Sequence, residues 1–171
     1  NEDDVDIYTL NDLFEDGYSS NMPIGEPRIY LIENKNIIGC LFLDIDKLNW
    51  DEQSDYEFDI VIREDKRGKG YSKILLDEMI KDFVNNYEQS PKILANVVNE
   101  DLKKYLSRKY GFKCEKGVGY GIETICYLSR KRAIDYLKSD GFKLANGGEV
   151  KFIIDEDEGD RISIKIKNVG E

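Results

Sequence analysis

The sequence of 171 residues contains no histidine. The usual general base at neutral pH and the commonest zinc ligand are therefore both missing. Acid–base chemistry in this chain has to use carboxylate, tyrosine, cysteine, lysine or water. The only three cysteines are Cys40, Cys114 and Cys126, which lie in apolar or strand-like contexts. Their spacing fits no metal-binding or disulfide pattern, so we expect three reduced cysteines and no metal site.

Positive charge is outnumbered, because 25 Lys and Arg stand against 35 Asp and Glu, for a net charge of −10. A nucleic-acid-binding protein normally needs a positive face, so this class is disfavoured. No apolar run is long enough to span a membrane, and no signal peptide is visible. Together with the cysteine pattern, these features predict a cytoplasmic protein without a membrane partner. Apolar residues make up 40% of the chain, which is enough for a packed core.

The order of hydrophobic patterns predicts alternating strands and helices. Strands at 28–33 and 37–45 are joined by the turn Asn34-Lys35-Asn36, and residues 46–55 are polar and loop-like. The following elements are a strand at 55–63, a helix at 70–86, a strand at 92–98, a helix from Asn99 to about Lys109, and strands at 112–115 and 122–128. This order indicates an α+β fold.

The pattern changes after about residue 130. A short helix at 133–139 precedes two alternating strands, around 150–154 and 162–166, joined by an acidic turn. Both strands place apolar residues on one face, so the hairpin has to pack within the chain or in a homodimer. We therefore expect a domain over 1–130 and a helix-plus-hairpin extension over 131–171.

The most informative motif is Arg67-Gly68-Lys69-Gly70-Tyr71-Ser72, between a strand and a helix. Such a turn directs backbone N–H groups and the positive end of a helix dipole at one spot, which suits a phosphate or pyrophosphate. The P-loop spacing is absent, and Lys73 stands where a dinucleotide-binding motif needs its third glycine.

Residues 28–129 resemble the GCN5-related N-acetyltransferase (GNAT) family. Arg67, Gly70 and Ser72 fill the acetyl-CoA signature Arg/Gln-x-x-Gly-x-Gly/Ala, although Ser72 departs from its last position. Asn99 after the next strand and Gly111-Phe112 after the next helix match a second family feature. The resemblance implies a mixed, mostly antiparallel central sheet flanked by helices. It also implies an acetyl-CoA-dependent N-acetyltransferase in which a primary amine attacks directly in a ternary complex.

By this resemblance, the CoA pyrophosphate binds the N–H groups of the glycine turn and the pantetheine arm pairs with the end of the preceding strand. That strand is expected to splay from the strand at 92–98. The cofactor-binding residues implied are Ile60, Val61, Ile62, Arg67, Gly68, Lys69, Gly70, Tyr71, Ser72, Lys73 and Asn99. Lys66, Arg67, Lys69 and Lys73 also form a local basic cluster in an acidic chain.

Two carboxylates and two hydroxyls are the catalytic candidates. Glu57 and Asp59 lie two apart, hence on one face of a strand, and could remove the proton from the amine directly or through water. The family often has a tyrosine as the acid for the thiolate, where this chain has Ser107. The hydroxyl of Ser107, Tyr105 or Tyr110, or a helix-dipole contact, could replace it. Tyr105 and Tyr110 are expected on different helical faces, with Tyr110 nearer to that of Ser107.

Two further functions remain open. A non-catalytic acetyl-CoA-binding or protein-interaction module would explain the serine at the acid position. An acyltransferase for a longer acyl group is the other. For the enzyme, the acceptor site is expected between the N-terminal segment, residues 46–55 and residues 116–121. These regions are rich in Asp, Glu and Tyr, which suits a cationic amine.

Overall fold

The computed structural model describes residues 13, 25–34, 36–51, 53–116, 124–139, 150–155 and 162–168. The strands are β1 (Glu26–Glu33), β2 (Asn36–Leu43), β3 (Tyr56–Ile62), β4 (Lys92–Val97), β5 (Lys113–Lys116), β6 (Thr124–Ser129), β7 (Val150–Asp155) and β8 (Ile162–Asn168). The helices are α2 (Ile45–Trp50), α3 (Tyr71–Asn86), α4 (Glu100–Tyr105) and α5 (Arg130–Leu137), with a 3-10 turn η1 (Glu64–Lys66) and a π turn η2 (Leu106–Tyr110).

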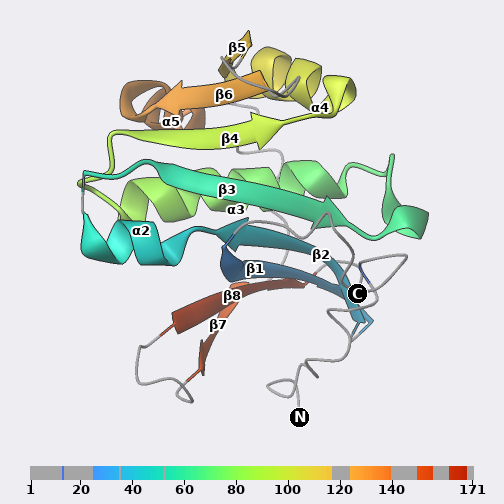
Figure 1. Cartoon of the computed structure of the whole chain (residues 1–171). Coiled ribbons are helices and arrows are strands. Elements are labelled where there is room, and N and C mark those ends of the chain that lie inside the picture. Colours follow the sequence, from blue (N-terminus) through green and yellow to red (C-terminus); the bar gives the residue numbers. More distant parts are fainter. Residues whose placement is uncertain are drawn as a thin grey trace.

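The strands form one sheet in the order β5-β6-β4-β3-β2-β1-β8-β7 (Figure 1). Neighbouring strands run antiparallel except β3–β4 and β1–β8, which are parallel. The β1–β2 hairpin turns at Asn34, whose φ of 51° lies in the left-handed region that asparagine tolerates. The prediction of an α+β fold with a mixed, mostly antiparallel sheet flanked by helices is therefore confirmed.

The main core lies between the sheet and α3, which crosses behind the strands in Figure 1. α3 buries one stripe at helical spacing, namely Leu75, Leu76, Met79, Ile80 and Phe83. α5 contacts both α3 and β6. Alternate residues of β1 and β2 point to the opposite face, where a second cluster contains Leu13, Ile32, Ile37, Cys40 and Phe42. Burial on both faces explains why β2 is almost continuously apolar.

Residues 45–50 form a helix rather than the predicted loop. Asp44 caps α2 by accepting a hydrogen bond from the backbone N–H of Lys47. Ile45 and Leu48, three apart, enter the main core, while Trp50 is 90% exposed. The helix has only six residues, and only two of its side chains enter the core, so its pattern was too weak a signal in the sequence.

The helix after β4 begins as predicted, since the Asn99 side chain accepts hydrogen bonds from the N–H groups of Asp101 and Leu102. It changes to a π turn after Tyr105 and ends at Gly111, whose φ is +82°. The wider turn brings residues five apart onto one side. Tyr105 and Tyr110 therefore have ring centroids 6.0 Å apart, and the prediction that they lie on different faces was wrong.

The C-terminal part begins with α5, which Ser129 caps, so the helix starts before the predicted residue 133. The predicted hairpin is present as β7 and β8. β8 pairs with β1 of the same chain over residues 29–32 and 165–168, so the hairpin extends the central sheet. This edge pairing joins the hairpin to the rest of the chain, while the packing of its apolar face, within the chain or in a homodimer, stays a prediction. The division into a domain over 1–130 and an extension over 131–171 stays a prediction.

The expectation of three reduced cysteines is corrected. Cys114 of β5 and Cys126 of β6 are directly opposite in the antiparallel ladder and form a disulfide, with Cα atoms 4.1 Å apart. Cys40 is free and buried in the second cluster. No pattern in the sequence indicated this disulfide, because the pairing depends on strand register. In the described part of the chain, no helix has the length and hydropathy needed to cross a bilayer.

Candidate functional site

The glycine turn lies between β3 and the first residue of α3. Gly68 and Gly70 have φ of +75° and +84°, where a Cβ is strained. A Cβ at either position would have no described atom within 4 Å, so the turn faces open space. In the described chain α3 has no side-chain cap and no acidic residue in its first turn. Its first N–H groups are therefore available to an anion.

The basic residues around the turn provide less free positive charge than predicted, because some are paired with carboxylates. Lys66 forms an ion pair with Glu33, at 2.5 Å between Nζ and Oε1. Lys73 pairs with Asp77 one helical turn further on, at 2.9 Å. The Arg67 side chain donates from Nε to the carbonyl of Ile62 at 2.9 Å. Lys69 is exposed on the turn. Two of the four predicted cations are thus neutralised by carboxylates.

β3 and β4 part soon after they begin to pair. Their parallel register contains only Tyr56↔Ile93 and Glu57↔Leu94. Beyond Glu57, β3 stays paired with β2 on its other side, and β4 stays paired with β6. The β3 backbone from Phe58 to Ile62 therefore has an edge without a β4 partner. This is the splay that the resemblance implies, and it includes the predicted pantetheine-pairing residues Ile60, Val61 and Ile62.

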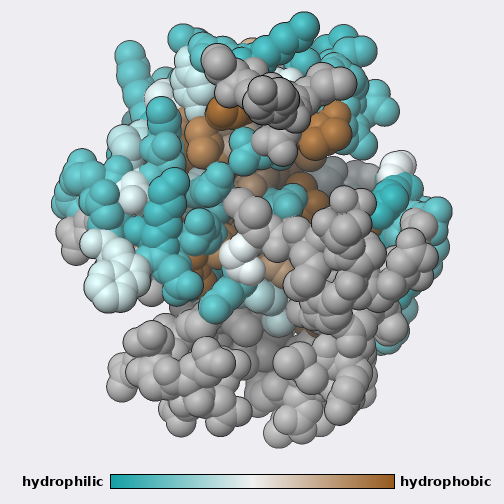
Figure 2. All heavy atoms as spheres, in the orientation of Figure 1, coloured by the Kyte–Doolittle hydropathy of each residue, from teal (hydrophilic) through white to brown (hydrophobic). Residues whose placement is uncertain are grey.

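The elements that follow β3 and β4 gather at one edge of the sheet. The two parallel strands point the same way, so the glycine turn after β3 and the start of α4 after β4 lie at the same end (Figure 1). Figure 2 shows the molecule from the same side as Figure 1, and hydrophobic residues lie in a recess near the middle of this view, between hydrophilic residues. An extended ligand with apolar and amide groups suits such a surface, since amides can pair with a free strand edge.

Glu57 lies where the two strands part. Its side chain is half-buried, and Asn96 on β4 places Nδ2 3.5 Å from Oε1. Burial raises the pKa of Glu57, and although Lys47 acts in the opposite direction, Asp44 and Asp55 raise it further. A carboxylate with a raised pKa is a better proton acceptor at neutral pH.

Asp59 shares the face of Glu57, as the spacing predicts, because the intervening Phe58 points into the main core. One Asp59 carboxylate oxygen accepts a hydrogen bond from the N–H of Ile60 at 2.9 Å.

Sequence reasoning missed Asp44 as an acidic neighbour of Glu57, whereas Asp55 belongs to the predicted acceptor region 46–55. The backbone N–H of Asp44 donates to the carbonyl of Glu57 at 3.0 Å, which joins the start of α2 to β3. Asp55 immediately precedes β3. The signal for Asp44 was its place as an N-cap before two apolar residues three apart. Of the predicted acceptor frame, the N-terminal segment up to residue 24, apart from residue 13, and residues 117–121 lie outside the described residues.

The hydroxyl candidates are separated by the structure. Ser107 is exposed on the π turn. Tyr110 is 4% exposed, and its hydroxyl donates to Asp77 at 2.8 Å, with the carbonyl of Lys73 at 3.3 Å. Burial raises the pKa of Tyr110, and Asp77 raises it further. Tyr136 of α5 also donates to Asp77. Tyr110 thus belongs to a buried polar cluster between α3 and α5, which suits packing better than proton donation.

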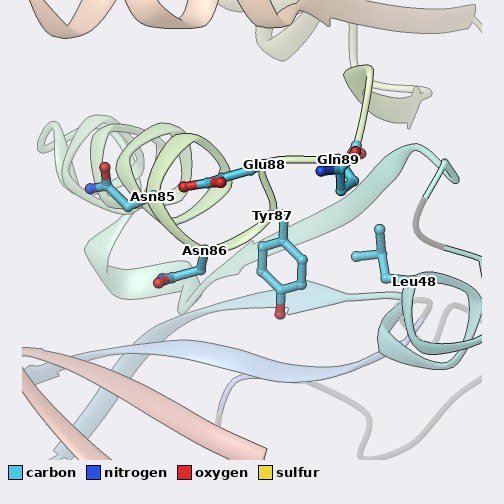
Figure 3. A pocket seen from close by; sticks show the side chains of 7 residues that line it. Leu48, Asn85, Asn86, Tyr87, Glu88 and Gln89 are labelled. Carbon is cyan, nitrogen blue, oxygen red and sulfur yellow. The ribbon is translucent and has the colours of Figure 1, made fainter.

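A pocket of about 540 Å³ lies at the other end of α3 (Figure 3). Leu48 of α2 faces Tyr87 across it, and the remaining lining comes from residues 85–90. A helix of 16 residues is about 24 Å long, so the pocket is separate from the glycine turn. No cluster of three metal-binding side chains occurs among the residues that the structure covers.

Comparisons with known proteins give partial structural likenesses. No family model matches the sequence, and no curated protein matches it. Mutant forms of the spermidine/spermine N-acetyltransferase SpeG from Vibrio cholerae share 24% identity at a TM-score of 0.45, over 59% of this chain and 62% of theirs. The dodecameric structure of the spermidine N-acetyltransferase from Vibrio cholerae shares 22% identity at a TM-score of 0.44, over 59% of this chain and 62% of its own. The chain spans less than two thirds of the length of these proteins.

Proposed function

We propose that the chain is an acetyl-CoA-dependent N-acetyltransferase that moves an acetyl group to a primary amine by direct attack in a ternary complex. One observation carries the proposal. The open edge of β3, the uncapped start of α3 and the half-buried Glu57 all belong to the region where β3 and β4 part. This region offers a strand edge for amides, N–H groups for a pyrophosphate and a base for an amine.

In this proposal the pyrophosphate of CoA binds the N–H groups from Gly68 to Lys73. Lys69 adds a positive charge from the exposed turn. The pantetheine amides pair with the backbone of Ile60 to Ile62, whose other edge is already bound to β2, although the Ile62 carbonyl also accepts a hydrogen bond from Arg67. Asn99 lies at the same end of the sheet, although its side-chain oxygen already caps α4.

The chemistry follows from the carboxylates. Glu57 accepts a proton from the ammonium group, directly or through water, and leaves a neutral amine. Its nitrogen attacks the thioester carbonyl, so that a C–N bond forms and the C–S bond breaks. The nitrogen loses its second proton as the amide forms, and the thiolate leaves with a proton taken from water or from the exposed hydroxyl of Ser107, which the proton from the nitrogen then replaces. Asp59 on the same face is the second base candidate.

The acceptor is proposed to be a cationic amine. Glu57 has Asp44 and Asp55 close enough to influence its pKa, so the local charge favours a cation over an anion. A cytoplasmic location and a homodimer are also part of the proposal. The expectation of three reduced cysteines was one reason to predict a cytoplasmic location. The Cys114–Cys126 disulfide removes that reason, because disulfides are uncommon in the cytoplasm.

Incubation with acetyl-CoA and a panel of amines tests the proposal, with release of free CoA thiol as the readout. The panel contains a polyamine, an aminoglycoside, free lysine and a peptide with a free N-terminus. Thiol release that depends on one amine class supports the enzyme, and Glu57→Gln is the matched variant. Failure to bind acetyl-CoA in calorimetry at millimolar ligand contradicts the proposal.

A second candidate is a non-catalytic acetyl-CoA-binding or protein-interaction module. It is favoured by the place of Tyr110, whose hydroxyl is committed to Asp77 inside the protein. Tight acetyl-CoA binding without thiol release for any amine in the panel would select this candidate over the enzyme.

A further inference from the structure

Both ends of the glycine turn are bound to a single side chain on another strand. Lys66 precedes Arg67-Gly68-Lys69-Gly70, and Tyr71 follows it as the first residue of α3. The Lys66 ammonium lies 2.5 Å from Oε1 of Glu33, and the Tyr71 hydroxyl donates to Oε2 at 2.5 Å. Each carboxylate oxygen therefore binds one end of the turn.

Glu33 is well placed to fix the turn in space. It is the last residue of β1, opposite Asn36 of β2, and β8 pairs with β1 up to Ile32. The Glu33 and Lys66 side chains are 16% and 20% exposed, so their contact is partly shielded from water. The hydrogen bonds from Lys66 and Tyr71 lower the pKa of Glu33, which keeps the carboxylate charged at neutral pH.

After Arg67, which is held by its contacts with the carbonyls of Ile62 and Glu64, the turn has little that would hold its shape. Its two glycines have positive φ, and glycine loses more conformational freedom on ordering than any other residue. Neither glycine has a described atom within 4 Å of an added Cβ, so packing does not restrain them from that side. A turn that must present several N–H groups to one anion binds more weakly if it has to be ordered during binding.

We propose that Glu33 is the positioning residue of the phosphate-binding turn, because its carboxylate ties Lys66 to Tyr71 across the turn. The inference rests on the proposed function, since it assigns the turn to the pyrophosphate of acetyl-CoA. It adds a residue that lies 33 and 38 positions away in sequence from its two partners, Lys66 and Tyr71.

Removal of the Glu33 carboxylate should change CoA affinity in opposite directions, depending on whether Glu33 acts through its charge or by positioning the turn. A carboxylate beside an anion site repels the anion, so a pure charge effect predicts tighter CoA binding after its removal. A positioning effect predicts weaker binding, because the turn loses its anchor. Glu64 is the matched control, since it is an exposed carboxylate in η1 beside the same turn.

The experiment measures CoA dissociation constants and acetyl-CoA kinetics for the parent, Glu33→Ala, Tyr71→Phe and Glu64→Gln. We expect Glu33→Ala to weaken CoA binding and raise KM for acetyl-CoA about tenfold, with kcat at saturation within about twofold of the parent. Tyr71→Phe removes one hydroxyl and should give a smaller loss of the same kind. Glu64→Gln should bind CoA as tightly as the parent or more tightly.

Three results would overturn the proposal. The first is parent-like or tighter CoA binding by both Glu33→Ala and Tyr71→Phe. The second is a loss in Glu64→Gln equal to that in Glu33→Ala, which would show that the loss is not specific to the contacts of Glu33 with Lys66 and Tyr71. The third is a parent chain that does not bind CoA, which removes the proposed function and this inference together. If Glu33→Ala does not fold, Tyr71→Phe against Glu64→Gln decides alone, and unchanged binding by Tyr71→Phe then overturns the proposal.

Discussion

Arg28 and Asp82, 54 positions apart, form an ion pair inside the protein through two hydrogen bonds of 3.1 Å and 2.8 Å. The Tyr56 hydroxyl donates to the same carboxylate at 2.7 Å, and Asn86 donates to it as well. The network joins β1, β3 and α3, so it fixes the helix that carries the glycine turn against the sheet.

We expect Asp82→Asn to lower the free energy of unfolding by about 3–5 kcal/mol, because it leaves the buried Arg28 without a counter-charge. Burial alone would raise the pKa of Asp82, but the hydrogen bonds and charge of Arg28 outweigh it and lower that pKa. The stabilisation is therefore complete above a pH of about 4 and is lost as pH falls through the lowered pKa. Urea unfolding at several pH values measures both effects. Asp65→Asn, at an exposed pair with Arg63, is the control and should leave stability unchanged.

Replacing Glu57 should separate chemistry from cofactor binding. We expect Glu57→Gln to reduce kcat by about 10²–10⁴-fold, with acetyl-CoA affinity close to the parent. The base must be ionised, so the parent rate falls as pH drops through a pKa above the ordinary 4.5. That acidic limb should be absent in Glu57→Gln. Asp59→Asn is the matched control, and a loss in Asp59→Asn with a normal Glu57→Gln would transfer the role of base to Asp59.

Gly70 separates backbone conformation from charge at the turn. Its φ of +84° means that any side chain adds strain of about 1–2 kcal/mol, while a Cβ meets no described atom within 4 Å. Gly70→Asn tolerates this conformation and should remain folded with modestly weaker CoA binding. Gly70→Asp should also fold but lose CoA binding, because its charge repels the anion. Calorimetry with CoA and circular dichroism measure the two effects, and equal affinities would place the phosphate elsewhere.

The sequence predicted those features that depend on neighbouring residues. Alternation identified β3, helical spacing identified α3, and Asn99 marked the start of α4. The positive φ of Gly68 and Gly70 agrees with a glycine-rich turn. Glu57 and Asp59 share a face because strand side chains alternate.

Features that depend on distant contacts were not predictable in the same way. The anchor from Glu33 to Lys66 and the disulfide from Cys114 to Cys126 both require the strand register. The π turn moved Tyr110 beside Tyr105, although α-helical spacing separates them. No periodic signal in a single sequence reports such a change of helix type.

The disulfide gives a simple count of thiols. Without reductant, the unfolded chain should react with a thiol reagent at one site, Cys40, because Cys114 and Cys126 are bonded. With reductant the count should be three. The folded protein without reductant should react slowly, since Cys40 is fully buried. Three reactive thiols in the unreduced, unfolded chain would contradict the bond.

Two truncations distinguish the roles of the C-terminal parts. The first ends at Ser129 and removes α5 and the hairpin, and the second ends at Ser139 and removes only the hairpin. α5 buries Ala133 and places the Tyr136 hydroxyl on Asp77 of α3, so its loss leaves a polar cluster incomplete behind the glycine turn. We expect the shorter chain to lose on the order of 3 kcal/mol or more, roughly 10 °C in Tm.

The chain that ends at Ser139 keeps this contact but exposes the edge of β1, which β8 otherwise covers. An open edge can pair with a second chain. We therefore expect CoA binding to be retained, with a new dimer or aggregate in light scattering. Tyr136→Phe in the full chain isolates the hydroxyl and should lower Tm without changing oligomer size. If both truncated chains kept the parent Tm and size, neither α5 nor the hairpin would contribute to stability.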